Sequence, residues 1–224
     1  MTMNDGARWI LGCSAMALCL LLIPLVSLHA GTLSFSAETM SAELAEGRER
    51  TILSGGARLS TDDIQISAES MELYGEDLIF ALCTGSVRVV HPEDQWELTA
   101  ERLFFNRRDD IIRIHGSAVM EDRKNEIVIK GGFIEIRNKD NIIIIQIGVR
   151  ILKEDLICRS QMAMYYREED RLELAGMPFV LWKDDEYRAT KIFVDLEKDE
   201  VQMEGDVQAD VSYEEEPNQE EASQ

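Results

Sequence analysis

Residues 67–89 read SAESMELYGEDLIFALCTGSVRV and contain two short signatures. The first is Ala-Glu followed by Ser-Met, inside a segment in which apolar and polar residues alternate. The second is Gly-Ser-Val-Arg-Val, which begins 17 residues after Ala68. Both return along the chain with a period of roughly 30 residues, and such a period is typical of repeat architectures. The sequence therefore predicts about six copies of one unit.

The first signature has a small residue at its centre, usually the Ala of Ala-Glu. Its copies are Ser36-Ala37-Glu38-Thr39-Met40, Ser67-Ala68-Glu69-Ser70-Met71, Thr99-Ala100-Glu101-Arg102-Leu103, Lys130-Gly131-Gly132-Phe133-Ile134, Arg159-Ser160-Gln161-Met162 and Arg188-Ala189-Thr190-Lys191-Ile192. The copy at Arg159 is degraded.

The second signature begins with Gly and places apolar or small residues at alternate positions after it. Its clear copies are Gly55-Gly56-Ala57-Arg58-Leu59, Gly85-Ser86-Val87-Arg88-Val89, Gly116-Ser117-Ala118-Val119-Met120, Gly176-Met177-Pro178-Phe179-Val180 and Gly205-Asp206-Val207-Gln208-Ala209. In one further copy Ile147 takes the place of Gly, and Gly148 follows it. The second signature follows the first by 16 to 18 residues throughout.

Each unit is predicted to form two β-strands with a turn between them. Segments such as Ile64-Gln65-Ile66-Ser67 alternate with the period of two that a strand requires. The polar turns expected at hairpin tips are Gly75-Glu76-Asp77, Asn106-Arg107-Arg108-Asp109-Asp110, Arg137-Asn138-Lys139-Asp140-Asn141, Arg167-Glu168-Glu169-Asp170 and Glu197-Lys198-Asp199-Glu200. The pattern predicts no long helix after residue 30.

The small residues at a fixed place in every unit have a structural use. A sheet that folds over itself needs tight bends, and Gly or Ala fits where a larger side chain would clash. Stacked from unit to unit, these residues predict one corner along the sheet. We therefore predict an all-β fold, an elongated and folded-over antiparallel sheet of about six two-strand repeats. Its free edges are expected near 33–35 and 207–211.

The N-terminal segment predicts export. Arg8 precedes an uncharged run from Trp9 to Leu28, which as a helix is long enough to cross a bilayer. The same run contains Pro24 and leads to Ala30, so it also has the form of a cleavable signal peptide. Both alternatives place the rest of the chain outside the cytoplasm.

These signals divide the chain into three parts. We expect a signal peptide or membrane anchor over 1–30, the repeat domain over 31–213 and an acidic disordered tail over 214–224. The formal net charge is -20, with 43 acidic and 23 basic residues. A nucleic-acid partner is not expected, because phosphates require neutralisation by Lys and Arg.

Two of the four cysteines, Cys83 and Cys158, lie in the repeat region. In an oxidising compartment they could form a disulfide, provided that the fold brings them together. The alternative is two buried free thiols.

The Ala-Glu-x-Met/Leu signature, followed by Gly-x-Val-x-Val, resembles the OstA-like repeat of periplasmic lipopolysaccharide transport proteins of the LptA type. Relatives of that repeat occur in LptC and in the N-terminal part of LptD. The likeness covers roughly residues 33–213. The departures are Gly131-Gly132 in place of Ala-Glu, the shift at Ile147 and Gly148, and the degraded copy at Arg159.

The resemblance implies a twisted β-jellyroll, also called a β-taco, located in the periplasm. Its apolar lumen would carry lipopolysaccharide or a related glycolipid from the inner to the outer membrane. It also implies three kinds of protein partner: inner-membrane transporter subunits, an outer-membrane LptD-like protein, and further copies of the chain joined end to end through edge strands. It implies no cofactor.

Alternation of apolar residues indicates which side chains would face such a lumen. An acyl chain exposed to water costs roughly 0.8 kcal/mol per CH2, which an apolar lining offsets. The candidate lipid-binding residues are Ile64, Ile66, Val87, Val89, Leu98, Leu103, Phe105, Ile134, Ile136, Val149, Ile151 and Val207. The alternative for each is packing in a closed core.

Four arginines lie on the Gly-side strand of their units: Arg58, Arg88, Arg113 and Arg150. They either form a basic stripe that meets lipid phosphates or are solvated residues paired with carboxylates.

No enzyme is predicted, because no catalytic motif is found. The only histidines are His29, His91 and His115, and no Cys/His spacing suggests a zinc site. There is no nucleophile elbow, phosphate-binding Gly loop or dinucleotide fingerprint. Acid pairs such as Asp109-Asp110 lie in predicted turns.

Four functions remain open. The first is a periplasmic lipid bridge, and the second is an LptC-like relay subunit tethered to the inner membrane through residues 9–28. The third is a cargo-free β-solenoid with a structural or adhesive role, and the fourth is a polysaccharide-cleaving β-helix enzyme. Antiparallel hairpin turns at mid-unit argue against the last two, and the bridge is favoured.

Overall fold

The computed structural model describes residues 32–43, 45 and 47–212, which are almost entirely β-structure. The predictions for 1–30 and 214–224 lie outside the described residues. The strands are β1 (Ser34–Ser36), β2 (Thr39–Glu43), β3 (Arg50–Ser60), β4 (Gln65–Tyr74), β5 (Phe80–His91), β6 (Trp96–Asn106), β7 (Ile111–Asp122), β8 (Ile127–Arg137), β9 (Ile142–Lys153), β10 (Leu156–Tyr166), β11 (Arg171–Ala175), β12 (Phe179–Trp182), β13 (Asp185–Arg188), β14 (Lys191–Asp195), β15 (Glu200–Glu204) and β16 (Gln208–Asp210). Two 3-10 turns, η1 (Glu76–Leu78) and η2 (Asn138–Asp140), lie at hairpin tips.

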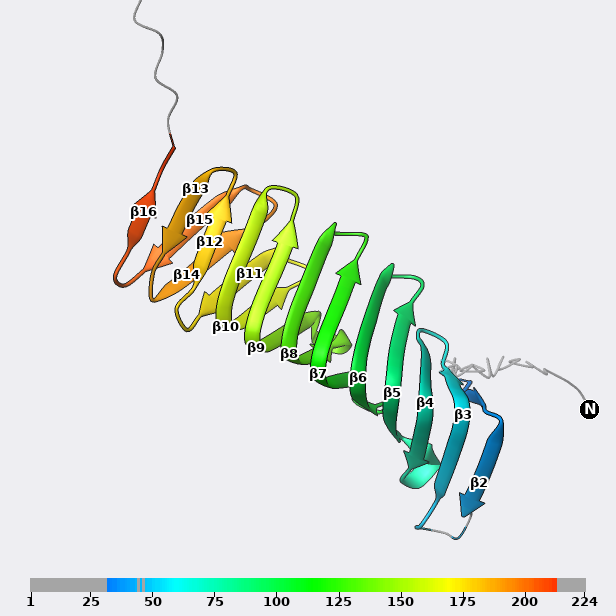
Figure 1. Ribbon diagram of the computed structural model, residues 1–224. Coiled ribbons are helices and arrows are strands. Elements are labelled where there is room, and N and C mark those ends of the chain that lie inside the picture. Colours follow the sequence, from blue (N-terminus) through cyan, green and yellow to red (C-terminus); the bar gives the residue numbers. More distant parts are fainter. Residues whose placement is uncertain (1–31, 44, 46, 213–224) are drawn as a thin grey trace, which may run out of the picture. The chain divides into compact units, whose positions relative to one another are not determined.

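The strands form one 16-stranded sheet, and strands adjacent in sequence pair in order from β3 to β11 (Figure 1). Every pairing is antiparallel. All of the predicted polar turns fall between strands. The predicted all-β, folded-over antiparallel sheet is therefore confirmed.

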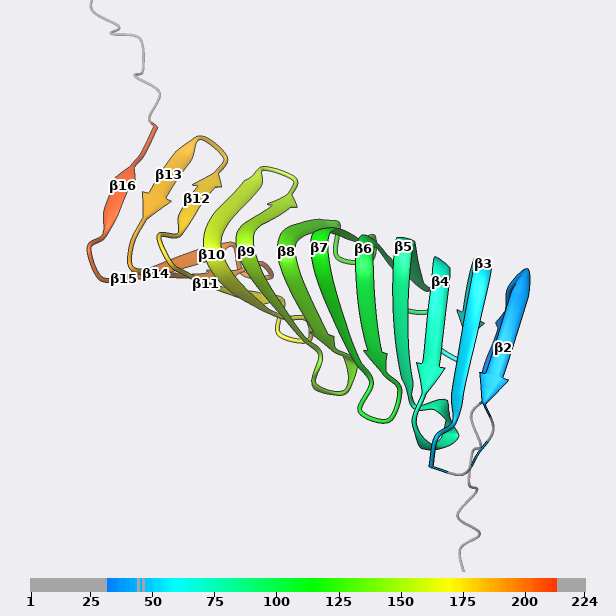
Figure 2. The ribbon, with the colours of Figure 1, turned by 60° about the horizontal axis from the view of Figure 1, so that its bottom comes forward.

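The sheet is folded along its length into two layers (Figure 2). The long strands β3 to β10 contribute one half to each layer. At both ends of the sheet each long strand is replaced by two short ones. The first layer is completed by β1, β12, β13 and β16, and the second by β2, β11, β14 and β15.

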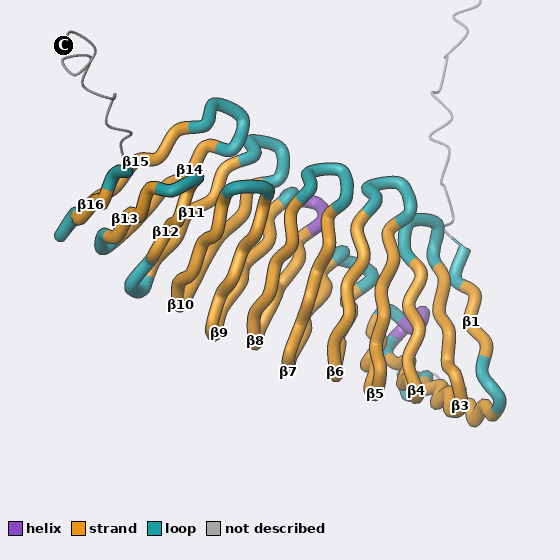
Figure 3. The backbone as a smooth tube through the Cα atoms, turned by 45° about the horizontal axis from the view of Figure 1, so that its top comes forward, coloured by secondary structure: helices purple, strands orange, loops and turns teal. Residues whose placement is uncertain are grey.

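Both sequence signatures lie on the line of the fold, which we call the corner line. Where β5 pairs with β6, the register shifts between Thr84 and Val87, so that Gly85 and Ser86 leave the ladder. Where β6 pairs with β7, it shifts between Thr99 and Arg102. Figure 3 shows the strands bending in succession. The prediction of one corner built from the repeated small residues is confirmed.

The Gly of the second signature is required at the corner line for two reasons. The backbone of Gly85 has φ +77°, a left-handed conformation that favours glycine. A Cβ at this position would also overlap the carboxylate of Glu69 on the preceding strand. The same crowding recurs between Gly116 and Glu101, where a Cβ would lie 3.0 Å from the carboxylate. The Glu of one signature thus packs over the Gly of the next.

The unit that departs from the signatures reverses this arrangement. Ile147 stands in the Gly position with φ +67°. Its neighbour across the corner line is Gly132, which stands where the other units have Glu. A Cβ on Gly132 would lie 2.9 Å from Ile147 Cγ2 and 3.0 Å from its Cβ. The two departures are therefore a single exchange, in which the large side chain has moved to the opposite strand.

Cys83 and Cys158 are both buried free thiols, on β5 and β10. Of the two alternatives drawn from the sequence, the structure has the unpaired thiols. Burial raises the pKa of both from 9.0 to about 12.

The two ends of the sheet are unpaired edges within the described residues. At the N-terminal end, β1 and β2 pair only with β3. At the C-terminal end, β15 pairs only with β14, and β16 only with β13. The free edges predicted near 33–35 and 207–211 lie here.

Candidate functional site

The space between the layers is lined by apolar rows that run from one free edge to the other. In the second layer, the strand register places one inward residue of every strand in line. This second inner row consists of Met40, Leu53, Met71, Cys83, Leu103, Ile114, Ile134, Ile145, Ala163, Leu174, Ile192 and Met203. Every member is apolar.

The first layer has a matching row. This first inner row consists of Phe35, Leu59, Ile66, Val89, Leu98, Met120, Ile129, Ile151, Cys158, Val180, Tyr187 and Ala209. Apart from Met40 and Ala209 at the free edges, the two rows belong to one hydrophobic cluster, in which most side chains away from the edges are 0–3% exposed. The layers are therefore in contact and the interior is closed.

Eleven of the twelve predicted lumen residues lie in this interior. Ile66, Val89, Leu98, Ile151, Leu103 and Ile134 belong to the inner rows, and Ile64, Val87, Phe105, Ile136 and Val149 are buried beside them. Val207 differs. It lies on the corner line between β15 and β16, at the free edge, and is 51% exposed.

Opposite the corner line, charged side chains join hairpin tips of the two layers, and we call these contacts the seam. Arg167, at a second-layer tip, reaches Asp94 and Asp122, which lie at first-layer tips. The Arg167 Nη1–Asp94 Oδ2 distance is 3.4 Å, and the Nε–Asp122 Oδ2 distance is 3.7 Å. The Arg167 side chain is 8% exposed and that of Asp122 is fully buried. Their charges therefore interact more strongly than they would at an exposed surface.

A second contact crosses the seam near the same place. Lys153 Nζ lies 3.5 Å from Asp170 Oδ2, and the Tyr165 hydroxyl donates a 2.9 Å hydrogen bond to Asp170 Oδ1. Burial, together with this hydrogen bond, raises the pKa of Tyr165 well above its ordinary value. Sequence reasoning assigned Arg167 and Asp170 to a turn and missed the seam. Repeat periodicity gives no signal for it, because it joins tips of different layers.

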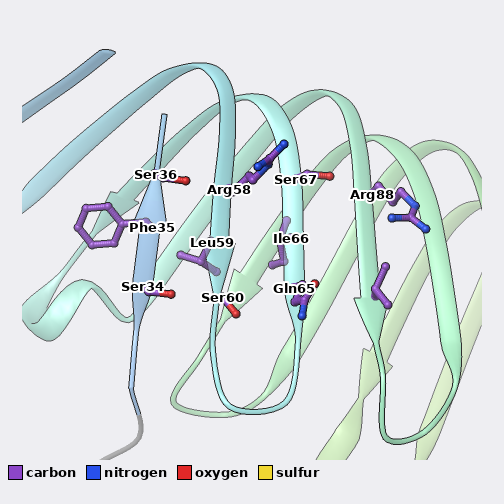
Figure 4. A pocket seen from close by; sticks show the side chains of 11 residues that line it. Ser34, Phe35, Ser36, Arg58, Leu59, Ser60, Gln65, Ile66, Ser67 and Arg88 are labelled. Atoms are coloured by element: carbon purple, nitrogen blue, oxygen red, sulfur yellow. The ribbon is translucent and has the colours of Figure 1, made fainter. Parts of the chain in front are cut away.

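A groove of about 550 Å³ lies at the N-terminal end, beside the edge strand β1. Figure 4 shows Arg58, Ser67 and Arg88 following one another across β3, β4 and β5. The other lining residues are polar (Ser34, Ser36, Ser60 and Gln65) or apolar (Phe35, Leu59, Ile66 and Val90). The lining of the groove is therefore mixed.

The four arginines of the predicted stripe divide into two groups. Arg58, Arg88 and Arg150 face outward in a single row of the first layer, whereas Arg113 lies on the second layer. Arg88 donates to both carboxylate oxygens of Glu97, at 2.6 and 2.7 Å. Two of the four therefore have the carboxylate partners that the second alternative predicts, because Arg113 also donates a 2.6 Å hydrogen bond to Glu135.

The described part of the chain has neither a metal-binding cluster nor a membrane-spanning helix. No group of three or more His, Cys, Asp or Glu side chains is placed to hold a metal ion. Between residues 32 and 212, no helix has the length and apolar character needed to span a membrane.

No protein-family model matches the chain, and no curated protein matches it. A search of solved structures matched the crystal structure of LptH from Pseudomonas aeruginosa, described as the LptA-homologous periplasmic component of the lipopolysaccharide transport device. The alignment covers 81% of this chain and 96% of that chain, with 7% sequence identity and a TM-score of 0.25. The architecture given above rests on the strand pairing of this chain alone.

Proposed function

We propose that the chain is a periplasmic lipid carrier that moves lipopolysaccharide or a related glycolipid from the inner to the outer membrane. The observation that carries the proposal is the pair of inner rows, which are apolar from one free edge of the sheet to the other. A multi-acylated lipid cannot cross water unshielded, and a continuous apolar interior offsets the cost without any chemistry.

Loading requires the layers to separate, because the interior is closed. The corner line joins the layers covalently at every long strand, so the seam is the side that can open. We infer that Arg167 and Lys153 hold the seam and that a lipid enters between the tips. The glycan and phosphates would stay outside, and the acyl chains would replace contacts between the two inner rows.

End-to-end assembly is supported by the register at the two edges. Within the sheet, Tyr187 pairs with Ala209 and Phe35 with Leu59. If β16 and β15 of one copy paired antiparallel with β1 and β2 of the next, Ala209 would meet Phe35 and Met203 would meet Met40. Both inner rows would then continue between copies, and Met40, now 62% exposed, would be covered.

The test uses a glycolipid with a photoreactive diazirine on its acyl chain. It is incubated with the unmodified chain, irradiated, and the cross-linked residues are mapped by mass spectrometry. On β7 and β8, inward residues such as Ile114 and Ile134 should be labelled, and their outward neighbours Arg113 and Glu135 should not. Labelling of outward residues alone, or equal labelling of both faces, would overturn the proposal.

A second candidate is a cargo-free structural protein, favoured by the near-zero exposure of the inner rows. Native mass spectrometry of protein purified from the periplasm without detergent separates the two functions. The carrier should show a lipid adduct, and this adduct should decrease with Ile136→Asp but not with Ile111→Asp, its outward control on β7. A clean protein mass that persists after incubation with envelope lipids supports the structural role. Retention of residues 9–28 in the mature protein would indicate the tethered relay.

A further inference from the structure

The outer face of the first layer carries a row of cations on consecutive strands. Lys130 on β8 is directly opposite Arg150 on β9, which is directly opposite Arg159 on β10. The row continues through Phe179 on β12 to Arg188 on β13. We call Lys130, Arg150, Arg159 and Arg188 the cationic row. All four side chains are exposed.

Three members of the cationic row have no carboxylate partner. Among the ion pairs of the described residues, none involves Lys130, Arg150 or Arg159. Like charges directly opposite each other in a sheet are destabilising. The adjacent cations therefore do not stabilise the sheet. The chain has a net charge of -20, so carboxylates are abundant, and the absence of carboxylate partners for these three cations needs another explanation.

The outward positions that flank these three cations on the two sides are mostly apolar. On the tip side, the next outward row reads Val128, Leu152, Ile157 and Leu181, each opposite the next. On the corner side lie Ile147, Met162 and Met177, which are 67%, 38% and 80% exposed. Two outward acids border the tip-side row: Glu121 on β7 is opposite Val128, and Glu186 on β13 is opposite Leu181 and pairs with Arg188. The cations thus lie between two apolar margins.

The N-terminal part of the same outward row is different. Arg88 is held by Glu97, and the row there consists otherwise of Arg58, Ser36, Ser67 and Thr99, with no two cations on adjacent strands. Acids also occupy the adjacent corner positions Glu38, Glu69 and Glu101, where the C-terminal part has Gly132, Gln161 and Thr190. The concentration of unpaired positive charge is a property of strands β8 to β10, because Arg188 on β13 pairs with Glu186 and Asp210.

We propose that this surface docks on a bilayer rich in anionic phospholipids. The cationic row would meet the headgroup phosphates, and Ile147, Met177 and the row from Val128 to Leu181 would enter the headgroup–acyl boundary. Charge alone would fit any polyanion, but the apolar margins on both sides match the layered chemistry of a membrane interface. Because charges farther away than about 10 Å are screened, the overall negative charge permits docking only with this face toward the lipid.

The proposal does not depend on lipid carriage, because it concerns the outer face of the sheet. It is tested by co-sedimentation of the chain from Gly31 onward, which keeps every described strand, with phosphatidylcholine vesicles. A second set of vesicles contains about one third phosphatidylglycerol. The unmodified chain should bind only the second set, and binding should fall as salt is raised.

Two triple variants remove the same charge from different places. Lys130→Gln/Arg150→Gln/Arg159→Gln should lose binding by about tenfold or more, since each basic residue near an anionic surface contributes measurably. The matched control, Arg58→Gln/Arg88→Gln/Arg102→Gln, should bind like the unmodified chain. Equal losses of binding in both variants would mean that net charge alone accounts for the binding, which would overturn the assignment of the cationic row.

A third variant tests the apolar margin. Ile147→Ser/Met177→Ser keeps the cations and should bind more weakly, with the largest loss at high salt, where apolar contacts carry more of the affinity. No binding to anionic vesicles by the unmodified chain would overturn the proposal. Binding to soluble poly-glutamate without binding to vesicles would also overturn it, because the surface would then fit an acidic protein segment.

Discussion

The corner between β6 and β7 and the corner between β8 and β9 are built from different residues and have the same shift in strand register. In the first, Glu101 packs over Gly116; in the second, Gly132 makes room for Ile147. In both, a residue with a large side chain faces a glycine across the corner line, so a single side chain fills the space between the strands. The repeat therefore conserves the combined volume of the pair, and the position of the large member can change.

The largest loss of stability is expected when only one residue of the exchanged pair, Gly132, is changed to the residue of the common signature. Gly132→Glu places a side chain 2.9–3.0 Å from Ile147, where neither can move without displacing backbone. We expect a loss of about 2–3 kcal/mol in the free energy of unfolding, which is typical of overpacking. Urea denaturation followed by circular dichroism measures it.

The double variant Gly132→Glu/Ile147→Gly is the control. It recreates the Glu and Gly pair of the β6–β7 corner, and it should recover most of the stability that Gly132→Glu loses. A double-mutant cycle gives the coupling directly, and about 1–2 kcal/mol is expected for groups in contact. Additive effects would mean that the two departures are independent, which would break the comparison.

The repeat itself could be predicted from the sequence, because both signatures lie at the corner line and are constrained there in every unit. The exchange could not. Gly131-Gly132 and the shift at Ile147 read as two separate departures, since their contact depends on strand register. In the structure Gly132 and Ile147 lie on adjacent strands, and only this placement shows that the two departures are in contact.

The seam and the exposure of Val207 could not be predicted from the sequence either, because both depend on which parts of the sheet lie next to each other. Alternation indicated that Ile134 and Ile136 share a face, but only the folded sheet shows that this face points inward. The seam at Arg167 and Asp122 depends on how two layers meet, and period-two alternation says nothing about that. Val207 was predicted from alternation to face the lumen, but it lies at the free edge of the sheet and is half exposed.

A smaller effect is expected at a common corner. Gly85→Ala adds a Cβ that meets Glu69 and imposes a left-handed backbone at φ +77° on alanine. We expect a loss of about 1.5–2.5 kcal/mol, which combines the backbone term with crowding. Combining Gly85→Ala with Glu69→Ala should recover the stability lost to the overlap with the carboxylate, and leave the backbone part and the 2.9 Å contact with the Cβ of residue 69. A double variant no more stable than Gly85→Ala would show that the carboxylate contributes nothing to the loss.

The cost of a left-handed backbone alone can be measured at corner positions where an added Cβ would touch nothing. Gly56 has φ +59° and Gly148 has φ +68°, and a Cβ at either position would have no neighbour within 4 Å. Gly56→Ala in a common unit and Gly148→Ala in the exchanged unit should therefore each cost about 1 kcal/mol. Thermal unfolding of both variants checks the equality. A cost at Gly148 clearly above that at Gly56 would mean that the exchanged corner carries extra backbone strain.

The smallest effect concerns the thiols, which report whether a corner opens locally. At pH 8 a thiol with a pKa of about 12 is ionised in only about one molecule in ten thousand, and both cysteines are 0% exposed. Native Cys83 and Cys158 should therefore resist iodoacetamide. In Gly85→Ala, Cys83 lies two residues from the disturbed corner and should react a few-fold faster, whereas Cys158 on β10 should not change. Equal acceleration of both thiols, measured by mass spectrometry, would mean that the corners open together with the whole sheet, because only a common opening exposes cysteines on strands as distant as β5 and β10.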